Sequence, residues 1–229
     1  MSVTSKRPRG ARLDPRIVRT RAAVSAAGHA LFLSRGYAGT TVEDIASHAG
    51  LTKRTVYNNF PDKEALFRQF IAEVTSYADA FAEGLAAEFT GMTAANLDTS
   101  LQGLGERLAR GIVRKEVIAI RRLLIGEARE FPSLAREYFD RAPGQVLEGL
   151  AAGFRRLQRA GLLQPADARR AAAQFAYLVA GEPLDRAVLV GAIPDRRQIL
   201  AIARAGVETF LARYGTARRA SGFRLRQGC

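Results

Sequence analysis

The stretch from residue 41 to residue 63 gathers cationic, hydroxyl and amide side chains that could act together on a nucleic acid. Lys and Arg neutralise phosphates, Arg and Asn also hydrogen-bond to base edges, and Thr and Tyr hydroxyls bind phosphate oxygens. A short polar helix with such side chains is by itself more often a solvated surface. The elements around it must therefore show whether it binds a nucleic acid. The candidate contact residues are Thr41, Thr52, Lys53, Arg54, Thr55, Tyr57, Asn58 and Lys63.

A helix is predicted to precede this stretch. Asp14 and Pro15 form a start signal, because an Asp side chain accepts from unpaired backbone amides and Pro suits the first helical position. Gly36 is expected to end the helix by adopting a left-handed backbone. The apolar face of the helix would include Ile17, Val24, Ala27, Leu31 and Phe32.

Two short helices joined by a glycine are predicted next. Thr41 would cap a helix over residues 42–49, and Asp44 three residues later resembles a capping box. Gly50 turns the chain, and Thr52 would cap a helix over residues 53–59. The expected buried side chains are Val42, Ile45, Ala46 and Ala49 in the first helix, Leu51 in the turn, and Val56 and Phe60 in and after the second.

This pattern is typical of a helix-turn-helix motif, whose second helix enters the DNA major groove. Residues 53–55, 57 and 58 are left facing outward. Pro61 ends the second helix and Asp62 would cap a long helix that continues into the eighties. Lys63, in its first turn, is expected to hold a free ammonium beside helix-terminal amides, which is a good phosphate site.

The charge of the chain favours a polyanionic partner. The 229 residues include 35 Lys and Arg against 22 Asp and Glu, a net charge of +13. Residues 1–70 alone carry 12 basic and 5 acidic residues, a net charge of +7. Such an excess indicates association with nucleic acid but does not determine a fold.

The run over residues 36–67, GYAGTTVEDIASHAGLTKRTVYNNFPDKEALF, resembles the DNA-binding signature of the TetR/AcrR regulators. It has the glycine and aromatic residue, the Thr-Thr and Ile-Ala pairs, the Ala-Gly-hydrophobic-Thr turn, and the final Lys-Glu-x-Leu. The resemblance covers about residues 14–75 and implies that the eight candidate residues contact DNA. One departure is that Asn58 and Asn59 stand where many members carry an aromatic residue and a histidine.

The rest of the chain predicts further amphipathic helices, so the fold class is all-α. They are expected over residues 96–113, 115–129, 133–140, 143–160, from residue 166, and over 195–214. Pro183 should stop or kink the helix that starts near residue 166. The predicted organisation is a basic flexible arm (1–13), a helix-turn-helix domain (14–75), a ligand-sensing and dimerisation domain (76–215) and a basic tail (216–229).

Residues 121–143, RRLLIGEAREFPSLAREYFDRAP, resemble the effector domain of an AefR-like subgroup of this family. The resemblance implies a small-molecule effector and a homodimer, while core packing is the alternative for each apolar residue. The expected ligand-lining residues are Leu104, Leu108, Ile112, Leu124, Glu127, Phe131, Tyr138 and Phe154. The expected dimer-interface residues are Ala172, Phe175, Ala176, Val179, Ile199, Ile202, Ala203 and Phe210.

Other classes of protein fit the sequence less well. An enzyme usually needs clustered His, Cys or paired carboxylates, but the chain has two His and one Cys, at the last position, so no catalytic, metal or cofactor site is expected. A helical ligand carrier would leave the outward-facing residues 53–58 unexplained. With no signal-peptide pattern and no membrane span, we expect a cytoplasmic protein. Its most common mode of action in the family would be that of a repressor, which binds a pseudo-palindromic double-stranded DNA operator and is released by a small molecule.

Overall fold

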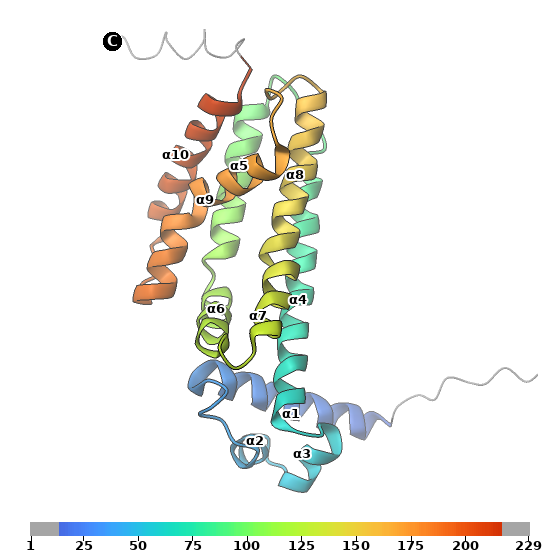
Figure 1. Cartoon of the computed structure of the whole chain (residues 1–229). Helices are drawn as coiled ribbons and strands as arrows, with labels where there is room; N and C mark the ends of the chain where they lie inside the picture. Colours follow the sequence, from blue (N-terminus) through green and yellow to red (C-terminus); the bar gives the residue numbers. More distant parts are fainter. Residues whose placement is uncertain (1–13, 217–229) are drawn as a thin grey trace, which may run out of the picture. The chain divides into compact units, whose positions relative to one another are not determined.

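The computed structural model describes residues 14–216, and within this range the chain is helical, with one isolated β-bridge between Leu163 and Gly215 (Figure 1). The predicted all-α class is therefore confirmed. The chain divides into two compact units between Phe70 and Ile71, five residues before the predicted boundary. The predicted basic arm, and the basic tail beyond residue 216, lie outside the described residues.

The first unit contains three helices and the start of a fourth. These are α1 (Pro15–Arg35), α2 (Val42–His48), α3 (Lys53–Asn59) and the first turns of α4 (Lys63–Ala87). The predicted caps are confirmed, since Asp14 accepts from the Arg16 amide, Thr41 and Asp44 form a capping box, and Thr52 accepts from the Thr55 amide. Gly36 ends α1 with a positive φ of 76°.

An aromatic core holds the first unit together. The ring of Phe32 contacts that of Phe67 edge-on, with centroids 5.1 Å apart, and Tyr37 packs on Phe67 at 5.0 Å. Val56 and Phe60 are buried as predicted. Ile17 is 53% exposed, so its predicted place on the buried face is wrong; α1 has no partner helix over its first turn, and burial begins at Val24.

The second unit is built from the remainder of α4 and six further α-helices of the described range. They are α5 (Leu97–Ile112), α6 (Lys115–Glu127), α7 (Pro132–Arg141), α8 (Pro143–Arg159), α9 (Ala168–Asp185) and α10 (Arg196–Tyr214). Each starts and ends within a few residues of its predicted range. Gly161 follows α8 with a φ of 68°, the left-handed conformation that glycine adopts without strain.

Helices α4, α5, α8, α9 and α10 share one apolar core. Phe154 stands at its centre, with ring centroids 5.4 Å from Phe89, 5.4 Å from Phe175 and 4.9 Å from Phe210. These rings meet beside α9, which packs on both α8 and α10 (Figure 1). The core is thus a packed cluster of side chains.

We predicted that Pro183 would either stop or kink its helix, and it does not stop α9. The helix continues to Asp185 and then widens into a π-helical turn, η1 (Arg186–Val190), that ends at Gly191. Pro has no amide hydrogen to donate to the preceding turn, so the helical hydrogen-bond ladder is already interrupted here. The π-turn is a local response that such interruptions allow.

Candidate nucleic-acid interface

Helix α3 presents a continuous polar stripe to solvent. Lys53, Arg54, Tyr57 and Asn58 occupy neighbouring positions on two turns and are all exposed, Tyr57 by 45%. The opposite side of α3 is anchored by the buried Val56. Neither Arg54 nor Asn58 has a side-chain hydrogen-bond or ion-pair partner within residues 14–216, so both are available to a ligand.

The predicted threonines have a structural task first. Thr41 accepts a hydrogen bond from the Asp44 amide at 3.1 Å and donates to the Asp44 carboxylate at 2.6 Å. Thr52 accepts from the Thr55 amide at 3.2 Å, and the hydroxyls of Thr52 and Thr55 lie 2.9 Å apart. These caps determine where α2 and α3 begin and so help to position α3. The hydroxyls of Thr52 and Thr55 still have hydrogen-bonding capacity for a phosphate.

Lys53 is paired within the motif. Its ammonium forms a hydrogen-bonded ion pair with Glu43 of α2, and it lies 5.9 Å from the centre of the Tyr57 ring. The hydrogen bond from Lys53 holds the pKa of the Glu43 carboxyl below its ordinary value, and the same bond raises the pKa of Lys53. Because the pKa of Glu43 is lowered, the pair is intact above pH 4.5 and is lost as the pH falls through the lowered pKa.

Replacing Glu43 with glutamine should strengthen binding to any duplex DNA. The change frees Lys53 and removes a carboxylate from a surface that would face phosphates. We expect affinity to rise about two- to fivefold, the scale of an exposed ion pair, and to do so alike for specific and random duplexes. Fluorescence anisotropy at two salt concentrations measures it. Glu64→Gln, which breaks the exposed Arg68–Glu64 pair, is the matched control, and unchanged or weaker binding by Glu43→Gln contradicts the expectation.

Lys63 does not hold the free ammonium that we predicted. Its Nζ donates to the carbonyl oxygens of Tyr37 and Thr40, each at 2.9 Å, and lies 4.0 Å from the centre of the Tyr37 ring. These carbonyl groups belong to the connection between α1 and α2, and they use two of the three donors of the ammonium. Lys63 therefore ties the start of α4 to this connection.

Arg21 of α1 is a positioning residue that the sequence did not reveal. Its guanidinium donates to the Asn59 carbonyl at 2.7 Å and to Gln69 Oε1 at 2.5 Å, and it stacks 4.3 Å from the centre of the Phe60 ring. Arg21 thereby fixes the C-terminal end of α3. Its partners lie 38 and 48 residues away, and no local pattern signals that pairing.

Asn58 and Asn59 have different environments. Asn58 is exposed, whereas Asn59 is half-buried and its side-chain amide donates to the Thr55 carbonyl at 2.8 Å. Asn59 is thus engaged within α3. Asn58 and Asn59 stand where many family members carry an aromatic residue and a histidine, and of these two only Asn58 faces outward.

The predicted dimer-interface residues belong to the core of their own subunit. Six of the eight are buried within the single chain: Ala172, Phe175, Val179, Ile199, Ala203 and Phe210. Ala176 and Ile202 are partly buried. Helices α9 and α10 use these faces to pack on each other and on α5 and α8.

The predicted ligand-lining residues fall into two groups. Leu104, Leu108 and Phe154 are fully buried in the packed core, and Ile112 packs at its edge. Leu124, Phe131 and Tyr138 are buried on α6 and α7, with Glu127 half-buried beside them. Burial raises the pKa of Tyr138, opposed by the charge and hydrogen bond of Arg121.

Comparison with known families agrees with this architecture. The model of the tetR family of bacterial regulatory proteins matches residues 25–70. The model of the AefR-like transcriptional repressor C-terminal domain matches residues 99–216, more than half of the chain. The matches correspond to the helix-turn-helix unit and to the larger helical unit.

Solved structures of regulators are similar over nearly the whole chain. A TetR-family transcriptional regulator from Mesorhizobium loti MAFF303099 is 30% identical, covers 89% of this chain and 100% of its own, and superposes with a TM-score of 0.78. The flavonoid-responsive regulator FrrA is 29% identical over 87% of this chain and 99% of its own, with a TM-score of 0.65.

A curated relative matches over a short segment. The HTH-type transcriptional repressor DhaR of Mycobacterium sp. (strain GP1) is 43% identical over 49 residues, which are 21% of this chain and 25% of that protein. The match thus spans about a quarter of the relative's length.

The fold and the exposed α3 stripe define a helix-turn-helix DNA-binding protein with a helical regulatory unit. The chain belongs to the TetR family of bacterial transcription regulators. It is therefore a DNA-binding regulator and not an enzyme. Within residues 14–216 no helix is long and apolar enough to cross a membrane, and no cluster of three or more His, Cys, Asp or Glu side chains could hold a metal ion.

Proposed function

We propose that this protein is a repressor that binds a pseudo-palindromic operator as a homodimer and is released by a small molecule. The observation that carries the proposal is the exposed α3 stripe, in which Arg54 and Asn58 have no partner in the described chain. Arg pairs with guanine and Asn with adenine through two hydrogen bonds each, and Thr52, Thr55 and Tyr57 can bind the flanking phosphates. The repressor names of the matching domain and of DhaR support this mode of action.

Binding to the DNA upstream of the protein's own gene tests the operator assignment. Arg54→Ala and Asn58→Ala should each weaken operator binding by about 1–3 kcal/mol per base contact and relax sequence preference, with a smaller loss on random DNA. Arg68→Ala is the control, since Arg68 is exposed on α4 and paired with Glu64. Anisotropy titration with operator and scrambled duplexes measures the difference. Equal losses on both duplexes would refute base reading by these two residues.

The homodimer would form on the outer face of α9 and η1. On α9, Tyr177 is 70% exposed and Leu178 37%, and on η1 Leu189 is 79% exposed and Val190 75%. Large apolar side chains rarely gather on a monomer surface without a partner. A second copy of the chain is the occupant that family membership supports, because two-fold symmetry matches a pseudo-palindromic site.

Placing charges on this face should give monomers. Leu189→Glu combined with Val190→Glu buries two carboxylates in the proposed interface, so we expect loss of the dimer in light scattering after gel filtration and weaker operator binding. Ile125→Glu is the matched control, because Ile125 is 65% exposed on α6, and it should leave the dimer intact. If the double variant remains dimeric, the interface lies elsewhere.

The effector is proposed to bind between α6 and α7. Tyr138 is 8% exposed and lies near the guanidinium of Arg121, whose Nε is buried with no partner in the described part of the chain. Buried polar groups among Leu124 and Phe131 suit a ligand with one polar and one apolar part. Screening metabolites for a rise in melting temperature tests this, and Tyr138→Phe should reduce that rise.

Acting on chromosomal DNA, the protein would function in the cytoplasm.

A further inference from the structure

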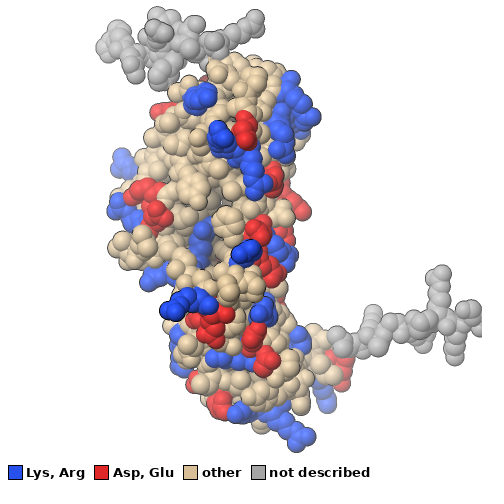
Figure 2. Space-filling model, viewed as in Figure 1, with Lys and Arg blue, Asp and Glu red and all other residues tan. Residues whose placement is uncertain are grey.

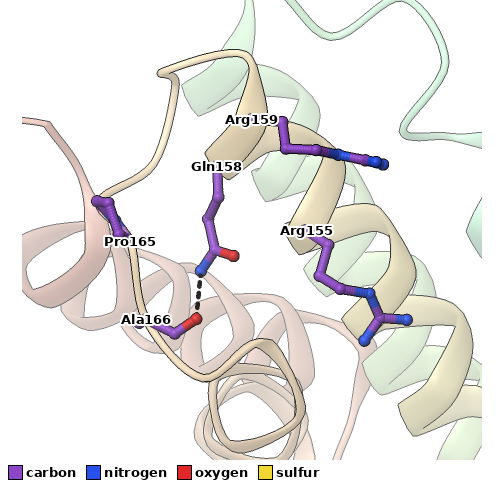
Figure 3. Close-up of a pocket in the computed structure, with 5 residues that line it drawn as sticks. All are labelled: Arg155, Gln158, Arg159, Pro165 and Ala166. Carbon is purple, nitrogen blue, oxygen red and sulfur yellow. Dashed lines mark hydrogen bonds between the residues drawn. The ribbon is translucent and has the colours of Figure 1, made fainter.

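The helical unit has a surface hollow away from α6 and α7. It has a volume of about 400 Å³ and is lined by Arg155, Gln158 and Arg159 of α8 and by Pro165 and Ala166 of the connection to α9 (Figure 3). Figure 3 shows the two arginine side chains extending in the same direction from successive turns of α8, with Gln158 turned toward the connection. The proline ring, the alanine methyl group and the arginine stems give the hollow mainly hydrocarbon walls.

Hydrogen bonds hold the loop side of this hollow in place. Gln158 Nε2 donates to the Ala166 carbonyl at 3.1 Å. On the other side of the loop, the Gln164 amide donates to the Tyr214 carbonyl at 2.8 Å, and its side chain donates to the Gly215 carbonyl at 2.7 Å. The wall is therefore tied to both α8 and the end of α10, so a ligand would meet a formed surface and would not need to order a loop.

The guanidinium groups of Arg155 and Arg159 are not neutralised by any acidic side chain of the described residues. Arg155 and Arg159 lie four residues apart on one face of α8, and within residues 14–216 neither has a hydrogen-bond or ion-pair partner. Neighbouring basic residues are engaged, since Arg169 pairs with Glu148 and Arg156 donates to Thr90. Figure 2 shows Lys and Arg side chains gathered at the same end of the helical unit as the end of α8. The acceptor Gln158 Oε1 also lacks a partner among the described residues.

We propose that this hollow is a second ligand site, which binds a small organic anion. Guanidinium groups bind carboxylate or phosphate oxygens through paired hydrogen bonds, and the planar face of arginine also packs on an aromatic ring. The anionic group lies between Arg155 and Arg159, and the apolar part of the ligand rests on the arginine stems that form part of the hydrocarbon walls of the hollow. The site is separate from the α3 stripe and from Tyr138, so it does not depend on the proposed function.

Calorimetric titration of the full-length protein with phenyl phosphate, benzoate and phenol tests the site. We expect phenyl phosphate and benzoate to bind with one site per subunit and phenol not to bind, and the tighter anion identifies the preferred head group. Arg155→Gln with Arg159→Gln should weaken binding at least about tenfold, because two charge-assisted contacts are lost.

Two controls separate a built site from general charge attraction. Arg196→Gln with Arg197→Gln removes the same charge from exposed positions at the start of α10 and should leave binding within about twofold. Ala166→Phe keeps both arginines but fills the hollow, and it should abolish binding. Circular dichroism verifies that each variant is folded. Absence of binding, equal loss in both double variants, or full binding by Ala166→Phe would overturn the proposal.

Discussion

Replacing Gly206 with alanine is expected to destabilise the helical unit by about 1–3 kcal/mol, the usual cost of overpacking a close contact. Gly206 lies on α10 where this helix meets α9, and an added Cβ would stand 2.5 Å from the Leu178 carbonyl oxygen and 2.6 Å from its carbonyl carbon. Those are backbone atoms that cannot rotate away, so the two helices must separate. The unfolding midpoint in urea, followed by circular dichroism at fixed protein concentration, measures the loss.

Gly103→Ala is the matched control. Gly103 lies within α5, is exposed, and has no atom within 4 Å of an added Cβ. Since alanine costs less backbone entropy than glycine in a helix, this change should stabilise the protein by about 0.5–1 kcal/mol. If both variants unfold at the same urea concentration, the close approach of α10 to α9 is not what makes Gly206 necessary.

Replacing Lys63 with methionine is expected to destabilise the helix-turn-helix unit by roughly 1–3 kcal/mol, because two hydrogen bonds to a charged group are lost. The Thr40 carbonyl loses the ammonium, while the Tyr37 carbonyl keeps only the bond from the Thr40 amide. Methionine keeps the hydrocarbon stem but cannot donate to Tyr37 and Thr40. Operator binding weakens because the connection between α1 and α2 loosens. Unfolding of the variant, and the salt dependence of its DNA binding, measure the two effects separately.

The salt dependence distinguishes this role from a phosphate contact. A lost phosphate contact changes the slope of log K against log salt by about 0.9, whereas a loosened connection leaves the slope unchanged. Lys53→Met makes the same chemical change at an exposed position and should change the slope with little effect on stability. A Lys63→Met protein with normal stability and a shallower salt slope would show that Lys63 contacts DNA after all.

Local signals in the sequence were sufficient for the helix-turn-helix. Asp14, Thr41, Thr52 and Asp62 cap helices where their side-chain chemistry predicts, and Gly36 ends α1 as expected. These signals are reliable because a cap and its amide lie within three residues, so the hydrogen bond forms whatever the distant chain does. The outward position of Arg54 and Asn58 follows from the same helical register.

The tertiary structure decided which side chains are free to act. Lys63 and Lys53 looked equally available in the sequence, but the first satisfies carbonyls 23 and 26 residues away and the second pairs with Glu43. The role of Arg21 likewise depends on Asn59 and Gln69. No periodicity encodes such contacts, because they require the helices to be packed first.

The faces of α9 show the same limit. Ala172, Phe175 and Val179 form one apolar face and Tyr177 and Leu178 another, and the sequence does not say which side meets α5, α8 and α10. Packing buries the first face and leaves the second exposed to solvent. The sequence by itself determined the family, the helices and the polar stripe of α3, since these depend on local caps and period. Tertiary packing determined which members of that stripe are unpaired and which apolar face is exposed.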